Sequence, residues 1–175
     1  MLKSTEIHTP IGPLLLVADR RGLCRIVLPG CDPGRHGRTA RTSAHPLFAD
    51  VARQMDAYFS GRETPFHLPL SLHGTAFQLA VWQLLARIPF GTTRSYGELA
   101  RQLGGVSKAR AVGAAAHANP LPLVIPCHRL IGADGRLTGF AGGLALKEKL
   151  LRHEGIVVSG SGKIKKIIEK QPDNR

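Results

Sequence analysis

The sequence predicts an α+β fold, in which a small N-terminal antiparallel sheet domain with one helix packs on a mainly helical C-terminal domain that contains a helix-turn-helix. Three observations lead to this class. Residues 5–28 contain short extended runs separated by turn residues, apolar residues recur at helical spacing after residue 46, and the 175 residues are 43% hydrophobic but only 21% charged. This composition is typical of a folded protein of one domain, or of one domain with a small annex.

Residues 1–73 are expected to form the sheet and its helix. Extended runs over 5–9, 14–18 and 23–28, with turn residues between them, indicate an antiparallel meander. Residues 29–44 are basic, rich in Pro and Gly and without an apolar period, so they are interpreted as a loop. The alternation over residues 66–72 predicts an edge strand, because Pro69 cannot donate a ladder hydrogen bond. A core-facing helix is expected from Pro46 to Gly61, with an apolar stripe of Leu47, Val51, Met55 and Phe59.

Residues 74–158 are expected to form the helical domain. The capping boxes Thr75-x-x-Gln78 and Ser95-x-x-Glu98 predict the starts of two helices, which end near residues 88 and 103. Ser107 is interpreted as the N-cap of a third helix, from Lys108 to about Ala118. A last helix carries the leucines of residues 144–151 and ends at Gly155. Residues 159–175 begin Ser-Gly-Ser-Gly and are expected to be a basic, disordered tail.

The second and third of these helices follow the helix-turn-helix pattern, whose second helix can enter a DNA groove. The pattern alone is weak, because many helical bundles contain such a corner. The third helix is rich in alanine, which suits close packing against the protein itself or a smooth face pressed into a narrow groove. Lys108 and Arg110 at its N-terminal end favour the groove, since the helix dipole and both side chains attract phosphate there.

The overall charge also favours DNA. Lys and Arg number 24 against 12 Asp and Glu, so the net charge is +12 and the pI is near 10.5. A polyanionic partner is therefore expected, with nucleic acid ahead of an anionic membrane surface. The N-terminus lacks a secretory pattern, and no apolar run has the length needed to cross a bilayer. We expect a cytoplasmic protein without membrane contact.

Chemistry is expected at the segment Val124-Ile125-Pro126-Cys127-His128-Arg129. Histidine and arginine beside a cysteine would lower its thiol pKa toward neutrality, whereas the alternative is a buried, inert cysteine. Neighbours on a strand point to opposite faces, so contact between Cys127 and His128 needs a turn or a water relay. Cys24 and Cys31 are interpreted as structural. The three cysteines form no disulfide framework and no zinc-ligand spacing, so we expect a reducing compartment and no metal.

The segment around Cys127 resembles the O6-alkylguanine-DNA alkyltransferase family. The matching residues are Pro126-Cys127-His128-Arg129, with Asn119-Pro120 upstream and Gly142-Gly143 and His153-Glu154-Gly155 downstream. The resemblance covers about residues 75–156, and a weaker one over residues 5–28 includes Thr9-Pro10-Ile11-Gly12-Pro13. It implies direct reversal of DNA damage without a cofactor. An O6-methylguanine, or an O4-methylthymine, would be flipped out of duplex DNA, and its alkyl group would pass irreversibly to one cysteine.

The resemblance also implies roles for individual residues. Cys127 would accept the alkyl group, His128 would act as a base through a water, Glu154 would orient that histidine, Asn119 would hold the cysteine loop, and Tyr96 would donate to the guanine ring. Arg110 would fill the gap left by the flipped base, with the helix in the minor groove. Other expected DNA contacts are Ser107, Lys108, Ala109, Thr93, Arg94 and Ser95. The expected substrate pocket comprises Phe140, Ala141, Arg129 and Leu130.

Two positions depart from the family pattern. Phe140 stands where a tyrosine often lines the pocket, and Ala141 stands where a serine often follows, so tolerance of bulky alkyl groups is left open. Two other functions are weighed. A non-catalytic lesion reader would lack the acceptor cysteine, and a Cys-His hydrolase would need an oxyanion hole that the sequence does not identify. We expect a monomer, with cooperative binding along DNA left open.

Overall fold

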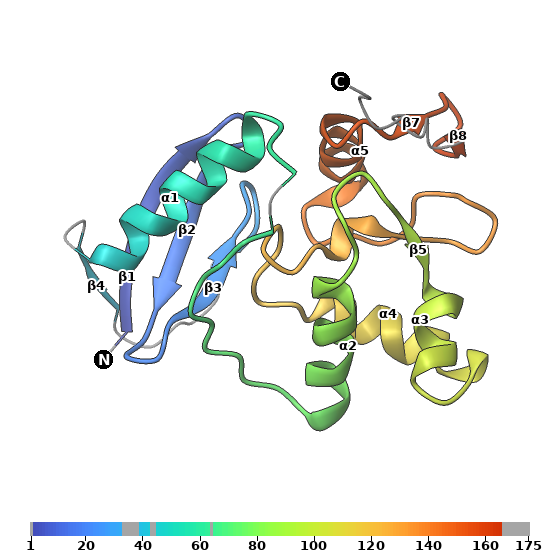
Figure 1. Ribbon diagram of the computed structural model, residues 1–175, viewed down its shortest axis with the longest axis horizontal. Helices are drawn as coiled ribbons and strands as arrows, with labels where there is room; N and C mark the ends of the chain where they lie inside the picture. Colours follow the sequence, from blue (N-terminus) through green and yellow to red (C-terminus); the bar gives the residue numbers. More distant parts are fainter. Residues whose placement is uncertain (1, 33–38, 43–44, 64, 166–175) are drawn as a thin grey trace, which may run out of the picture.

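The computed structural model describes residues 2–32, 39–42, 45–63 and 65–165, and begins with a sheet covered by one helix (Figure 1). Strands β1 (Leu2–Thr9), β2 (Gly12–Ala18) and β3 (Leu23–Val27) form the expected antiparallel meander. At the β1–β2 turn Gly12 has a φ of 112°, and a Cβ there would lie 2.9 Å from Pro29. Glycine therefore suits this turn for both backbone and packing reasons.

A fourth strand corrects the interpretation of residues 29–44 as a loop. Strand β4 (Thr39–Arg41) pairs parallel with β1, so the sheet order is β3-β2-β1-β4. Residues 33–38 and 43–44 lie outside the described residues. Three residues are too few to show a period of two, which is why the sequence pattern did not reveal this strand.

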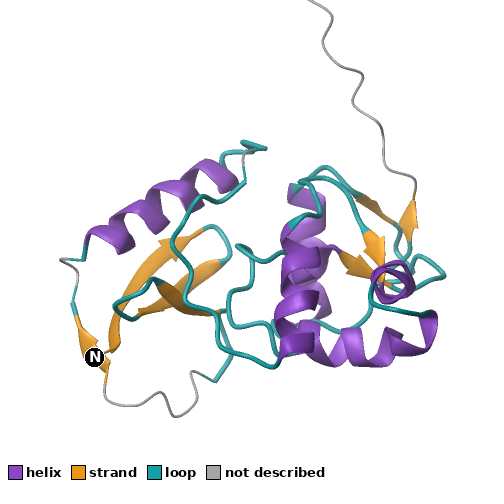
Figure 2. Cartoon of the chain, turned by 60° about the horizontal axis from the view of Figure 1, so that its bottom comes forward, coloured by secondary structure: helices purple, strands orange, loops and turns teal. Residues whose placement is uncertain are grey.

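Helix α1 (Pro46–Phe59) lies against one face of the sheet (Figure 2). Its start is capped by His45, whose Nδ1 accepts from the Leu47 backbone N–H at 3.3 Å. The helix lies where the sequence predicts it. At its two ends, however, Phe48 and Tyr58 are buried in place of the expected Leu47 and Phe59. The fully buried side chains are Phe48, Val51, Met55 and Tyr58. Their spacing of three, four and three residues follows the 3.6-residue turn better than a strict spacing of four.

The edge strand expected over residues 66–72 is wrong. This stretch makes one isolated bridge, between Leu23 and Leu70, in which the Leu23 N–H donates to the Pro69 carbonyl at 2.8 Å and the Ser71 N–H donates to the Leu23 carbonyl at 2.9 Å. Pro65 and Pro69 have no N–H, so the segment is extended but cannot continue a ladder along β3.

The C-terminal half carries helices α2 to α5 (Figure 1). Helices α2 (Ala76–Ala86) and α3 (Tyr96–Gln102) each begin with the capping box that the sequence predicts. Helix α4 (Ala109–His117) follows a 3₁₀ turn, η1 (Val106–Lys108). The N-cap assigned to Ser107 is wrong: Lys108 occupies that position and no side chain caps the helix. The η1 turn leads the chain into the helix instead, with the Lys108 N–H donating to the Gly105 carbonyl at 3.1 Å.

The chain then forms a 3₁₀ turn, η2 (Cys127–Arg129), strand β6 (Leu130–Ile131), which pairs parallel with β5 (Arg94–Ser95), and helix α5 (Gly143–His153). The expectation of disorder from residue 159 is wrong for residues 159–165, because β7 (Val157–Val158) and β8 (Ile164–Lys165) form a hairpin there. Residues 166–175 lie outside the described residues. Of the helices in the described part of the chain, none has the length and hydropathy that a membrane crossing requires.

The two halves share one core. A cluster of buried apolar side chains runs from the sheet and α1 into α2, α4 and the loop before Cys127, and includes Leu14, Leu16, Val51, Met55, Leu85, Val112, Leu121 and Ile125. A main-chain hydrogen bond, from the Ile26 N–H to the Pro120 carbonyl at 2.9 Å, joins β3 to that loop. The N-terminal sheet therefore braces the segment that carries the cysteine.

Candidate active site

Cys127 sits on a tightly held loop. The Asn119 side chain donates from Nδ2 to the Ile125 carbonyl at 2.7 Å and accepts from the Leu121 N–H at 3.0 Å. Leu123 lies in the same loop with a φ of 75°, the one positive φ among the described non-glycine residues. Such strain persists where the surrounding structure holds the backbone. The 3₁₀ turn that follows supplies the turn which contact between Cys127 and His128 requires, and both residues are buried.

The imidazole of His128 is fixed in one orientation. Its Nε2 lies 2.7 Å from Glu154 Oε1, and both side chains are fully buried. An ionised carboxylate can only accept, so Nε2 carries the hydrogen and Nδ1 presents its lone pair. Nδ1 is buried and has no hydrogen-bond partner within the described part of the chain. Burial, opposed by Glu154, lowers the pKa of His128, so the resting ring is neutral and its Nδ1 can accept a proton.

Glu154 is held by donors from four residues, which lie in three parts of the chain. Arg129 Nε donates to Oε2 at 2.9 Å, and the Gly91 N–H donates to the same oxygen at 3.1 Å. Oε1 accepts from the Tyr58 hydroxyl at 2.8 Å, from His128 Nε2 at 2.7 Å and from Arg129 Nη2 at 3.0 Å. Burial disfavours the charge on Glu154, but His128 and Arg129 outweigh it and hold the pKa at about 2. The carboxylate is therefore ionised at neutral pH.

The expectation that its neighbours lower the Cys127 pKa is wrong for the resting protein. Burial raises the pKa of this thiol, while hydrogen bonding from Asn119 and the charge on Lys147 oppose the rise. The guanidinium of Arg129, on which the expectation depended, is paired with Glu154, and His128 is neutral. A buried thiol next to a neutral imidazole needs proton transfer before it can act as a nucleophile.

A cavity of about 490 Å³ opens onto Cys127. Of the expected pocket residues, Phe140 and Ala141 line it, together with Tyr96, Ala109 and Arg110. The placement of Arg129 and Leu130 in the pocket is wrong. Arg129 turns toward Glu154 and the Ile88 carbonyl, and Leu130 is fully buried in the core. The lining residues that sequence reasoning missed are Gly113, Ala116, His117, Thr138 and Gly139.

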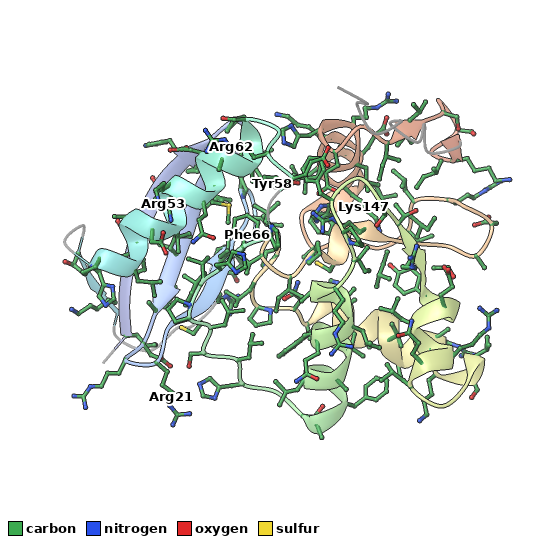
Figure 3. All side chains as sticks on the ribbon, viewed as in Figure 1. Arg21, Arg53, Tyr58, Arg62, Phe66 and Lys147 are labelled. Carbon is green, nitrogen blue, oxygen red and sulfur yellow. The ribbon has the colours of Figure 1, made fainter. Side chains whose placement is uncertain are left out.

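Lys147 is a further residue that sequence reasoning missed. It projects from α5 into the C-terminal half (Figure 3) and is fully buried, where its Nζ donates to the Thr138 carbonyl at 2.6 Å and to the Gly139 carbonyl at 3.4 Å. Burial lowers its pKa to about 8, and the nearby Cys127 opposes this. Lys147 therefore anchors the loop that forms one wall of the cavity. The sequence signal was its position on the core-facing side of α5, three residues before Leu150.

The expected DNA contacts divide into two groups. Arg110 is exposed at the start of α4 and Ala109 beside it lines the cavity. The others lie on the connections around α3: Lys108 Nζ donates to the Leu103 carbonyl at 2.6 Å, Ser95 caps α3, and exposed Arg94 donates to the Thr93 carbonyl at 3.0 Å. Ser107 is exposed on η1. Lys108 thus satisfies the end of α3 as well as adding positive charge near α4.

Fold and site together define a class of two-domain α+β proteins in which a helix-turn-helix stands beside a pocket that contains a buried cysteine. Both halves match known domains. The DNA-binding domain of 6-O-methylguanine DNA methyltransferase matches residues 76–156, and the ribonuclease-like domain of the same protein matches residues 2–72. The chain therefore belongs to the 6-O-methylguanine DNA methyltransferase family, which confirms the resemblance found in the sequence.

Individual relatives match over most of their length. The chain is 42% identical over 148 residues to a methylated-DNA–protein-cysteine methyltransferase of Methanosarcina acetivorans, covering 85% of this chain and 95% of that one. It is 45% identical over 157 residues to the Mycolicibacterium paratuberculosis protein of the same name, covering 88% and 93%. The crystal structure of Mycobacterium tuberculosis OGT in complex with DNA matches with a TM-score of 0.77 and 42% identity, covering 87% and 91%. These matches confirm the α+β two-domain fold.

Proposed function

We propose that this protein is a methylated-DNA–protein-cysteine methyltransferase, which repairs DNA by direct reversal and takes the alkyl group of an O6-alkylguanine onto Cys127. Family membership and the names of the relatives support the activity. The observation that carries the assignment to Cys127 is its place on the wall of the cavity, one residue before a histidine that is hydrogen-bonded to an ionised, buried Glu154. No cofactor takes part in the proposed reaction.

The proposed reaction starts from the thiol. Through one water, Cys127 gives its proton to Nδ1 of His128, the nitrogen that has no other partner in the described chain, and Glu154 stabilises the imidazolium that forms. The thiolate attacks the alkyl carbon, the S–C bond forms as the C–O6 bond breaks, and the bonding electrons pass to the guanine. Tyr96 donates a hydrogen bond to the ring as this charge develops. Its hydroxyl faces the pocket loop, 3.3 Å from the Thr138 carbonyl.

The product explains why one molecule reacts once. A thioether offers water no activated carbonyl, so hydrolysis does not regenerate the thiol. Repair is therefore stoichiometric, with one alkyl group per protein.

The 490 Å³ cavity accepts methylguanine, and O4-methylthymine is a second candidate substrate. Exposed Ala141 leaves one wall of the cavity without a bulky side chain, which favours larger alkyl groups.

Double-stranded DNA is the proposed partner, held by α3 and α4. The small residues Ala109 and Gly113, half-buried where α4 lines the cavity, let the α4 surface approach a minor groove closely, while Arg110 occupies the space that the flipped base leaves. The net charge of +12 supports phosphate contacts, to which Lys108, Ser107 and residues 93–95 contribute. We propose that the protein acts as a monomer in the cytoplasm; its three free cysteines support a reducing compartment.

The proposed division of labour follows the two matched domains. The N-terminal domain, residues 1 to about 73, braces the site, and the C-terminal domain binds DNA and carries out the transfer. The first family match ends at residue 72 and the second begins at residue 76. These positions support a boundary between the two domains. The β7–β8 hairpin supports extension of the C-terminal domain to residue 165.

The test uses duplex DNA with a radiolabelled O6-methylguanine. We expect one equivalent of label on Cys127, located by mass spectrometry of peptides. Cys127→Ser should take no label but keep binding lesion DNA, whereas the matched variant Cys24→Ser should react like the wild type. Label that stays on DNA with tight binding would identify a lesion reader, and label on another residue would refute the assignment of Cys127.

A further inference from the structure

The site receives one of its hydrogen bonds from the N-terminal domain. Tyr58 lies in the last turn of α1, at the side of the helix that faces the C-terminal half (Figure 3). Its side chain is 3% exposed, and its hydroxyl donates to Glu154 Oε1 at 2.8 Å, across 96 positions of sequence. The same oxygen accepts from His128 Nε2 at 2.7 Å. The tyrosine thus touches the carboxylate at the atom that supports the imidazole.

We propose that Tyr58 is a positioning residue for alkyl transfer: it holds Glu154 Oε1 in line with His128 and limits how strongly that carboxylate draws a proton onto the imidazole. The inference rests on the proposed roles of His128 and Glu154. It also gives the N-terminal domain a part in the chemistry beyond bracing the fold. Tyr58 touches neither Cys127 nor the cavity in front of it, so its effect passes through Glu154.

The tyrosine ring is held firmly enough to position a partner. It packs edge-on against Phe90, with ring centroids 5.8 Å apart, and against Phe66 at 5.9 Å. His153 on α5 contacts the ring at 5.1 Å and its Nε2 lies 2.8 Å from the Tyr58 carbonyl. Contacts from α1, α5 and two connecting segments fix the ring on several sides, so the hydroxyl has little freedom to leave Glu154.

The charges around Glu154 decide the direction of the effect. His128 and Arg129 favour its ionised form, and Tyr58 shares Oε1 with His128 Nε2 and Arg129 Nη2. Burial and the neighbouring carboxylate raise the pKa of Tyr58, so the hydroxyl stays a donor at neutral pH. Without this donor, Oε1 holds more negative charge for the His128 proton. The imidazolium is then better stabilised and the pKa of His128 rises.

The remaining titratable groups near this pair must be followed separately. Lys147 acts on both His128 and Cys127 through its charge, and His153 contacts the Tyr58 ring and the Tyr58 carbonyl. Replacing the hydroxyl alone leaves both groups in place. Tyr58→Phe is therefore the informative variant, because it removes one donor and keeps the aromatic ring.

The experiment measures single-turnover methyl transfer from duplex O6-methylguanine DNA between pH 4.5 and 8.5. In Tyr58→Phe we expect the acidic limb of the pH–rate profile to shift to higher pH: the pH at which the rate is half-maximal on that side should rise by about half to one unit. The rate at pH 7 should fall about fivefold, since Glu154 is less well held. Nitrogen-15 NMR of the His128 ring should show the same rise in its pKa, measured directly in free protein.

The control is Phe66→Leu, which loosens the same ring contact but keeps the hydroxyl. It should lower thermal stability at least as much as Tyr58→Phe, yet leave the acidic limb and the His128 titration where they are in wild type. Equal profiles for wild type and Tyr58→Phe would overturn the proposal, as would an equal displacement in both variants. If wild-type protein left Cys127 unmethylated, the proposed function itself would fail instead.

Discussion

Replacing Glu154 by Gln removes the charge at the centre of the site and keeps its shape. Glu154 is 4% exposed. Burial opposes its charge, but His128 and Arg129 lower its pKa from 4.5 to about 2. The difference between these two pKa values is worth about 3 kcal/mol of folding free energy at pH 7. This agrees with the range of about 3–5 kcal/mol for breaking a buried ion pair, here by leaving Arg129 without its partner.

The pH dependence follows from the sign of this change. The folded pKa lies below the unfolded one, so the contribution is complete above about pH 5 and is lost as the pH falls toward 2; about 1 kcal/mol remains near pH 3. The gap in unfolding free energy between wild type and Glu154→Gln should therefore narrow with acid. Urea titrations at pH 7, 4 and 3 measure it.

The matched control lies on α5, the helix for which Glu154 is the C-cap residue. Glu148 pairs with Arg152 at 2.8 Å, and the two side chains are 35% and 50% exposed, so Glu148→Gln should change the unfolding free energy by about 0.5 kcal/mol or less. A gap for Glu154→Gln below about 1 kcal/mol at pH 7 would refute the reasoning. So would a gap that stays constant as the pH falls, because the charge would then contribute nothing to it.

Three further predictions concern charge and hydrogen bonding at the site. Burial lowers the pKa of Lys147 to about 8, so between pH 8 and 10 wild type should gain about 2 kcal/mol of unfolding free energy over Lys147→Met. Denaturation at both pH values measures this gain, and Lys149→Met, which removes an exposed lysine of the same helix, is the matched control. Arg110→Ala should weaken duplex binding about tenfold, because the space left by the flipped base is then no longer filled; unchanged binding would contradict this role. Tyr96→Phe should slow methyl transfer about a hundredfold while lesion binding stays intact, and equal losses in both would argue against a donor role.

Local sequence patterns predicted most of the secondary structure. The capping boxes at Thr75 and Ser95 satisfy helix-end donors with side chains three residues apart, so the sequence alone contains all their partners. Ser107 has the same residue type at a plausible position, but the η1 turn leads into α4 without any side-chain cap. Residue type indicates where a cap can form, and the backbone path decides whether it does.

Segments whose structure depends on distant partners were predicted less well. The β7–β8 hairpin at residues 157–165 contains a Ser-Gly-Ser-Gly stretch whose composition alone predicts disorder. Residues 66–72 alternate like a strand, yet β3 takes a single bridge from them. Strand pairing depends on a neighbour elsewhere in the chain, and a short window of sequence does not contain that neighbour.

The site shows the same division. By itself the sequence singled out the cysteine that we propose to react, the histidine beside it and the helix-turn-helix, because these depend on residue type and short spacing. Only the tertiary structure decided that Arg129 turns to Glu154 instead of the pocket, that Lys147 is buried behind the pocket loop, and that Tyr58 reaches Glu154 from the other domain. Burial and through-space contact set which hydrogen bonds form and where each pKa lies, and both arise when distant segments pack together.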